Sequence, residues 1–168
     1  MGTGDPDLYK AFCHRFIQLC RDGGRIGVVL PRAAFINQGS TEFRSTIIQG
    51  GNVDALIMLF NAGGWVFDDA EHKYTMALFA MTKSNTIGDV IPVGGPFNSL
   101  TEFTSGIASG LVDVSVDLVL TATDNALIPV ISTVCSEEAM QALTQMRNSP
   151  RFDSTHEGEW YFKPAMDI

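Results

Sequence analysis

Stretches with helical spacing alternate with short apolar runs over the first half of this chain, and this order restricts the possible fold more than any other feature. Apolar side chains recur at helical spacing from Asp7 to about Arg21, and a second helix is expected from Ser40 or Thr41 to Gly50-Gly51. The runs that predict strands are Arg25–Leu30, Val53–Phe60 and Tyr74–Met81. Because helices in such an order connect strands of one sheet, the pattern predicts an α/β fold.

The three expected strands differ in their setting. The run at 25–30 is short, rich in β-branched residues and closed by Pro31, which favours a strand buried in a parallel sheet. Residues 61–73, between the second and third strands, show no helical pattern. We therefore expect those two strands to pair antiparallel, as a hairpin at one edge of the sheet.

The sequence changes character after Lys83. Glycine and proline are frequent in 85–99, which predicts irregular structure, and a short helix is expected within 97–110. Residues 112–121 alternate between apolar and polar side chains, which indicates a strand with one solvent-exposed face. A further helix is expected over 136–147.

The composition restricts the class of protein. The chain has 168 residues, and we divide it into half of an α/β sheet, residues 1–83, and a less regular α+β appendage, residues 84–168. Lys and Arg number 11 against 19 Asp and Glu, a net charge of −8, so the chain is not expected to grip nucleic acid by a basic surface of its own. Its three cysteines form no disulfide framework, which favours a reducing compartment. No apolar run approaches the roughly 18 residues of a membrane span.

Two sequence patterns resemble ligand-binding motifs, but each has a simpler structural interpretation. Gly2-Thr3-Gly4 resembles the start of a phosphate-binding loop, but no strand precedes it, so a lead-in without a ligand is expected. Cys13, His14, Cys20 and His72 lack the Cys-x-x-Cys spacing of a zinc site. The thiols are therefore expected in the core, and no metal site is predicted.

Asp54, Glu71 and Lys73 are the residue types of a metal-dependent nuclease. In such an enzyme two carboxylates hold a hard cation and a lysine assists the attacking water. Here the Glu-x-Lys pair precedes the expected strand at 74–81 instead of lying in it. A solvated turn is the alternative interpretation, and a nuclease remains a third hypothesis for the function.

The segment Gly63-Gly64-Trp65-Val66-Phe67 is the best candidate for a binding site. Two large aromatic residues follow a glycine break at the end of the expected strand 53–60, and open α/β sheets bind ligands at the carboxyl ends of their strands. A loop aromatic in this place could stack on a planar ligand. Burial of both rings against the core is the competing interpretation.

Four segments in order resemble one known family. They are Asp7-Leu8-Tyr9-Lys10-Ala11-Phe12, Gly23-Gly24-Arg25-Ile26-Gly27-Val28-Val29-Leu30-Pro31, Gly64-Trp65-Val66-Phe67-Asp68-Asp69 and His72-Lys73-Tyr74-Thr75. Together they resemble the second half of the catalytic domain of adenine-specific DNA methyltransferases. The resemblance is greatest to the large bacterial type II restriction–modification enzymes that join methyltransferase, specificity region and often nuclease in one chain. It covers residues 3–83, and extends more loosely to 149–152 and 160–164, which look like the entry to the specificity region.

The resemblance implies a fold and an organisation. The fold is that of a class I S-adenosylmethionine-dependent methyltransferase, a Rossmann-like α/β sheet with an antiparallel edge hairpin. Residues 1–83 correspond to the C-terminal half of the catalytic domain, and residues 84–168 to a linker and the start of the target-recognition region. The segment 23–31 matches the fifth strand of the family's sheet.

The resemblance also implies roles for particular side chains. Phe12 corresponds to an aromatic residue beside the adenine of the cofactor S-adenosylmethionine, with Leu8 and Tyr9 in the same motif. Phe67 corresponds to the aromatic residue that stacks on the flipped target adenine, which needs a new π surface once it has left the duplex. The residues expected to support that loop are Trp65, His72 and Tyr74.

Two motifs of the family are absent from this chain. These are the cofactor-binding glycine motif and the Asn/Asp-Pro-Pro-aromatic catalytic loop; no Pro-Pro occurs in the sequence. Both are expected upstream of Met1 in a longer parent protein, so no catalytic residue is assigned here. We expect that the isolated chain neither methylates DNA nor binds S-adenosylmethionine tightly.

The expected partners follow from the same resemblance. They are the missing N-terminal half of the catalytic domain and, through the parent protein, double-stranded DNA in the bacterial cytoplasm. The parent would belong to a restriction–modification or phage-defence system and could carry a fused endonuclease. Half a sheet exposes a strand edge, so self-association is expected. The rival hypothesis is a non-catalytic α/β module that binds a protein partner, which the acidity and the missing motifs favour if this chain is the whole natural protein.

Overall fold

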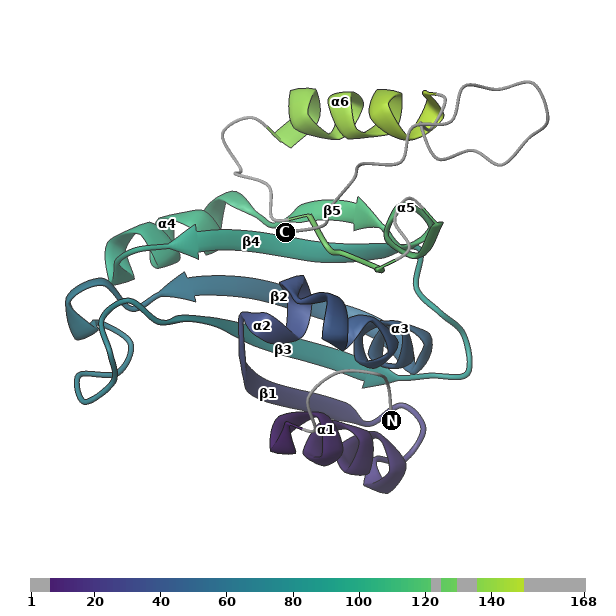
Figure 1. Cartoon of the computed structure of the whole chain (residues 1–168), viewed down its shortest axis with the longest axis horizontal. Helices are drawn as coiled ribbons and strands as arrows, with labels where there is room; N and C mark the ends of the chain where they lie inside the picture. The colour runs from purple at the N-terminus through teal and green to yellow at the C-terminus, as the bar shows by residue number, and fades with distance from the viewer. Residues whose placement is uncertain (1–6, 122–124, 130–135, 150–168) are drawn as a thin grey trace, which may run out of the picture. The chain divides into compact units, whose positions relative to one another are not determined.

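A five-stranded mixed sheet in the order β1-β3-β2-β4-β5 is the centre of the computed structural model, which describes residues 7–121, 125–129 and 136–149 (Figure 1). The strands are β1 (Arg25–Pro31), β2 (Gly51–Phe60), β3 (Thr75–Lys83), β4 (Val90–Phe97) and β5 (Val112–Ser115). The helices are α1 (Leu8–Leu19), α2 (Ala33–Ile36), η1 (Gln38–Ser40), α3 (Thr41–Gln49), η2 (Ala62–Gly64), α4 (Leu100–Ser109), α5 (Val116–Thr121) and α6 (Ser136–Asn148). The α/β class is confirmed.

The chain separates into two compact units, Met1–Ser136 and Glu137–Ile168. The first holds the whole sheet, and α6, the helix expected over 136–147, is the described element at the start of the second. The sheet continues past residue 83 into β4 and β5, while a functional boundary at residue 83 stays a prediction. The segments 149–152 and 160–164 and the Gly2-Thr3-Gly4 motif lie, except for Ser149, outside the described residues.

The topology confirms the antiparallel hairpin but not its place at the edge. β3 pairs antiparallel with β2 and also with β1, so it lies between two strands that run in the same direction. β4 then pairs parallel with the other side of β2. The edge prediction was wrong because hairpin pairing fixes only one neighbour of each strand, and the outer neighbours are remote in sequence.

Two predictions in the second half of the sheet were wrong. The irregular structure expected over 85–99 contains β4, in which Ile91 and Val93 are fully buried. The strand expected over 112–121 ends at Ser115, and α5 begins at the next residue, Val116. The Ser115 hydroxyl accepts a hydrogen bond from the backbone N–H of Leu118 at 3.3 Å. This side-chain cap starts a helix that the alternating pattern does not reveal.

The two faces of the sheet carry different cores. On one face, where α2 and α3 lie over β2 and β3 (Figure 1), the rings of Phe35 and Phe79 lie 5.8 Å apart. On the other face Leu59, Met76 and Phe97 form a cluster. Met76 and Phe79 point to opposite faces because side chains alternate along a strand.

Arg44 of α3 is fully buried and its hydrogen-bonding partners are neutral oxygen atoms. The guanidinium donates to four backbone carbonyls and to the Thr41 hydroxyl, with distances from 2.6 to 3.3 Å. The carbonyls belong to Ala34, Asn37, Asn125 and Ala126. Burial lowers the pKa of Arg44. This one side chain joins α3, α2 and the segment 125–126, which are far apart in sequence.

β1 is an edge strand in the described part of the chain. Of its residues only Leu30 is buried, and the Val29 side chain is 54% exposed. The expectation of a strand buried in a parallel sheet was therefore wrong for this chain by itself. The composition of β1 is that of an interior strand, but its outer edge pairs with no described strand.

None of the described helices is both long enough and apolar enough to cross a lipid bilayer.

Candidate functional site

The loop between β2 and β3 lies at the carboxyl end of β2. β1, β2 and β4 run in the same direction, so their carboxyl ends meet at one edge of the sheet. Gly63 and Gly64 adopt φ values of 67° and 75°, a region that residues with a side chain rarely enter. These two glycines allow the sharp turn that brings Trp65 and Phe67 back over the strand end.

Trp65 anchors this loop to the sheet. Its indole Nε1 donates a hydrogen bond of 2.7 Å to the carbonyl oxygen of Phe60, the last residue of β2. Its ring packs against the cluster of Leu59, Met76 and Phe97 and lies 6.3 Å from the ring of Phe103 in α4. Of the two interpretations left open by the sequence, burial against the core describes Trp65.

Phe67 is placed differently from Trp65. Its side chain is 48% exposed, and Tyr74, at the end of the same loop, is more exposed still. The ring of His72 lies against the turn, since a Cβ added to Gly64 would stand 3.1 Å from His72 Nε2. Trp65 and His72 thus contact the loop that presents Phe67, while Tyr74 borders it.

The three residues expected beside the cofactor adenine do not share one face of α1. Tyr9 points to α3: its ring meets Phe43 edge-on at 5.7 Å, and its hydroxyl lies 3.4 Å from Ser40 Oγ. Burial raises the pKa of Tyr9. Leu8 and Phe12 are exposed instead, and the ring of Phe12 stacks on that of Phe16 at 6.2 Å.

A pocket of about 350 Å³ lies at the strand-end edge and was missed by the sequence analysis. We call it the strand-end pocket. Its lining comes from the carboxyl ends of β1, β2 and β4, from α2 and from the start of β3: Arg32, Ile36, Met58, Phe60, Thr75, Pro96 and Asn98. No local motif marks these positions. Only the rule that ligands bind at the carboxyl ends of strands points to them.

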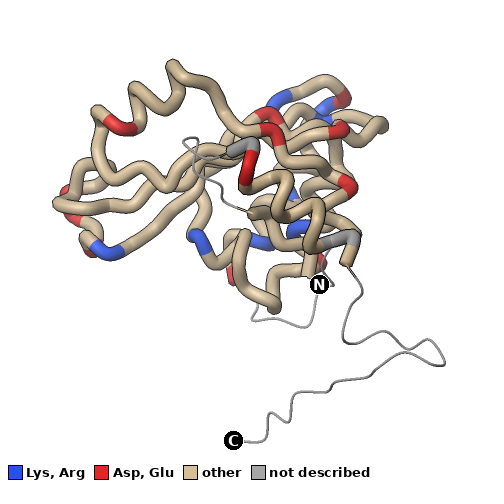
Figure 2. Tube along the Cα trace, turned by 90° about the horizontal axis from the view of Figure 1, so that it is seen from above, with Lys and Arg blue, Asp and Glu red and all other residues tan. Residues whose placement is uncertain are grey.

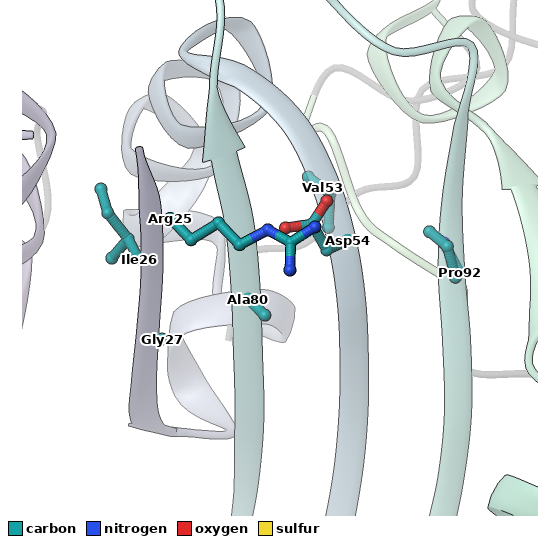
Figure 3. Close-up of a pocket in the computed structure, with 7 residues that line it drawn as sticks. All are labelled: Arg25, Ile26, Gly27, Val53, Asp54, Ala80 and Pro92. Atoms are coloured by element: carbon teal, nitrogen blue, oxygen red, sulfur yellow. The ribbon is translucent and has the colours of Figure 1, made fainter. Parts of the chain in front are cut away.

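A second pocket, of about 520 Å³, lies on the open face of the sheet away from this edge. Figure 3 shows Arg25 extending past Ala80 toward Asp54, with Gly27 and Pro92 on the flanking strands. The Asp54 carboxylate accepts a hydrogen bond of 2.8 Å from the Thr82 hydroxyl. Small side chains on the floor leave this part of the sheet uncovered.

The residues of the nuclease hypothesis are not brought together. Asp54 lies near the start of β2, opposite Ala80 and Met81, while Glu71 and Lys73 precede the start of β3. They are therefore at opposite ends of the hairpin. Among the described residues, no three His, Cys, Asp or Glu side chains form a group that could hold a metal ion. Cys13 is buried as expected, and burial raises the pKa of its thiol to about 11, whereas Cys20 is only partly buried.

Charge is distributed without an extended basic surface on the described residues. Figure 2 shows Lys and Arg positions interspersed with Asp and Glu positions along the fold. The β2–β3 loop itself carries Asp68, Asp69 and Glu71 beside Lys73. The half-exposed aromatic ring of Phe67, and not a run of cations, is thus the feature that distinguishes the strand-end edge.

No protein-family model matches this chain, and no match is found among curated proteins.

Proposed function

We propose that this chain is the C-terminal half of the catalytic domain of an adenine-specific DNA methyltransferase of the restriction–modification type. The observation that carries the proposal is Phe67, an aromatic ring held half-exposed on an anchored loop at the carboxyl edge of an α/β sheet. A base that has left a duplex needs such a surface, and base–aromatic stacking is worth about 1–3 kcal/mol.

The edge at β1 supports the same proposal. A strand with the composition of a sheet interior stands at an open edge, and charged residues that blunt natural edges are absent from its centre. The neighbouring helix α1 leaves Leu8, Phe12, Phe16 and Leu19 exposed, spaced so that they share one helix face. Both features fit a domain that continues in another polypeptide segment, and the mixed sheet is compatible with a Rossmann-like fold.

The proposed reaction is transfer of the methyl group of S-adenosylmethionine to the exocyclic amine of adenine in double-stranded DNA. This chain supplies the stacking surface at Phe67 and a wall of the cofactor pocket around Phe12 and Leu8. The groups that accept hydrogen bonds from the target amine belong to the missing half. The coding sequence upstream of Met1 tests this directly: a glycine motif followed by a Pro-Pro loop in the same reading frame is expected, and a native start at Met1 would count against the proposal.

Adenosine is expected to bind weakly at Phe67. Stacking of about 1–3 kcal/mol alone predicts a dissociation constant above about 1 mM. An NMR titration should therefore shift the backbone amide resonances of residues 66–68, and Phe67→Trp should keep this response while Phe67→Ala removes it. Leu100→Ala, which truncates an exposed apolar side chain on α4, is the matched control. A response that survives in Phe67→Ala would refute the assignment of this ring.

S-adenosylmethionine is expected not to bind this chain with micromolar affinity. Phe12 and Leu8 are exposed, whereas Tyr9 points to α3, so the three side chains do not lie on one surface. Isothermal titration at chain concentrations near 100 µM should give no saturating heat. A dissociation constant in the low micromolar range would show that the cofactor pocket is complete without the missing half.

A module that binds a protein partner is a second candidate function, and the exposed face of α1 favours it. The two candidates differ in which residues matter. Binding by such a module depends on Phe12 and Leu19 and is indifferent to Phe67→Ala. Binding of a flipped adenine depends on Phe67.

A further inference from the structure

Asn61 is the first residue after β2 and its side chain is fully buried. It is polar and uncharged, and it lies where the chain leaves the sheet for the β2–β3 loop. A buried carboxamide without partners would be strongly unfavourable, so its hydrogen bonds reveal what it does in the fold.

Both ends of the carboxamide bind the backbone of the loop. The Oδ1 atom accepts hydrogen bonds from the N–H groups of Val66 at 3.0 Å and Phe67 at 3.1 Å. The Nδ2 group donates to the carbonyl oxygen of Phe67 at 2.8 Å and to that of Ala70 at 3.4 Å. One side chain thus holds the N–H and the C=O of the same residue, Phe67.

The backbone of Asn61 adds two further bonds. Its N–H donates to the carbonyl oxygen of Tyr74 at 2.9 Å, and its carbonyl accepts from the N–H of Gly64 at 3.1 Å. The residue is therefore tied to both ends of the loop, and through them to β2 and β3. The Phe67 ring is exposed, but hydrogen bonds from the buried Asn61 side chain hold the peptide groups on both sides of the Phe67 Cα.

We propose that Asn61 is the positioning residue of the stacking site, which sets the height and direction of the Phe67 ring before a base arrives. This inference rests on the proposed function for its ligand, a flipped adenine, and on the hydrogen bonds alone for its mechanism. A ring fixed in advance loses less conformational freedom on binding than a ring on a loop that must be ordered by the ligand.

The chemistry of the position is specific to asparagine. The side chain must accept from two N–H groups and donate to two carbonyl oxygens, which a carboxamide can do and a carboxylate cannot. Aspartate would place a negative charge beside the carbonyls of Phe67 and Ala70. Once protonated, aspartic acid regains one donor with nearly the same shape, so Asn61→Asp is a variant that acidification can repair.

The test compares the wild-type chain with Asn61→Ala, Asn61→Asp and a control, Asn85→Ala. Asn85 also follows a strand, but it is exposed and comes after β3, whose end lies at the opposite edge of the sheet from Phe67. Amide hydrogen exchange at Val66 and Phe67 reports the loop, and the adenosine titration reports the ring. Global unfolding is followed separately by urea denaturation of each variant.

Asn61→Ala is expected to raise the exchange rates of the Val66 and Phe67 amides at least tenfold and to weaken adenosine binding threefold to tenfold in a chain that is still folded. Asn61→Asp should behave in the same way at pH 7 and recover at pH 5, because burial favours the protonated acid. The loop also carries the ionisable side chains of Asp68, Asp69, Glu71 and His72, so the wild-type chain is measured at both pH values. Asn85→Ala should match the wild type.

Unchanged exchange at Val66 and Phe67 in Asn61→Ala would overturn the inference, and so would global unfolding of both Asn61 variants, since Asn61 would then hold the fold and not the ring. Failure of the proposed function has a different signature. In that case adenosine gives no response in the wild type, while the amides of Val66 and Phe67 still lose protection in Asn61→Ala.

Discussion

Replacing Arg44 with methionine is expected to lower the free energy of unfolding by about 3–5 kcal/mol. Methionine fills much of the volume but leaves the carbonyls of Ala34, Asn37, Asn125 and Ala126 without their donor. Each buried acceptor that loses its partner costs about 1–3 kcal/mol, and some of these carbonyls can recruit water. Since domains are stable by only about 5–15 kcal/mol, this loss removes a large share of the stability of such a domain.

Urea denaturation followed by circular dichroism measures this effect. Arg44→Lys keeps the charge but has no planar group to reach acceptors in two directions, so it should fall between the wild type and Arg44→Met. Arg15→Met is the matched control. Among the described residues, the Arg15 guanidinium donates to the exposed side chain of Gln18 at 3.3 Å, and its loss should change stability by less than about 0.5 kcal/mol. Equal midpoints for Arg44→Met and Arg15→Met would show that the buried network contributes nothing.

The elements of the first half could be predicted from the sequence because local patterns determine them. The spacing of apolar residues in α1 and the apolar runs of β1, β2 and β3 each identify their own element, and the structure confirms all four within a few residues. The pairing of β2 with β3 also follows from a local fact, namely that residues 61–73 show no helical pattern; the structure has only the three-residue η2 there.

The predictions failed where remote contacts decide the outcome, whereas the helices expected within 97–110 and over 136–147 are confirmed as α4 and α6. β4 contains Gly94, Gly95, Pro92 and Pro96, residues that weaken strand propensity, yet parallel pairing with β2 makes it a strand. β1 has the sequence of a buried strand and stands at an edge. The sequence pattern of β1 is typical of a strand with neighbouring strands on both sides. In the described part of this chain, β1 has one neighbouring strand, β3.

The candidate site, like the fold, could be predicted from the sequence only in part. The sequence identifies Trp65 and Phe67 as a pair, but nothing in it says that one ring would pack, partly buried, against the core and that the other would be exposed. Asn61 and Arg44 were missed because their partners are backbone groups, which carry no residue signature. Only an asparagine between a strand and a Gly-Gly turn could have drawn attention to Asn61.

The exposed face of α1 and the open edge of β1 lead to the second large prediction: the isolated chain associates with itself through this surface. Phe12 is 57% and Leu19 67% exposed, and they lie on one helix face with Leu8 and Phe16. Full burial of such a side chain is worth about 1.5–3 kcal/mol. The variant Phe12→Glu/Leu19→Glu should therefore weaken association at least 100-fold, which sedimentation velocity between 5 and 500 µM would detect as a shift to monomer.

Further variants in the same experiment show which residues the self-association uses. Phe67→Glu, which charges an exposed aromatic outside this surface, should leave association unchanged. Val29→Lys places a charge on the edge strand itself and should weaken association if strands pair there, because edge charges oppose pairing. A wild-type chain that stays monomeric at 500 µM with a high melting temperature would contradict the prediction, since such a chain tolerates this apolar face without covering it. If the missing half of the domain normally covers this surface, adding it should convert the self-associated chains to heterodimers, because it competes with a second copy for the same helix face and strand edge.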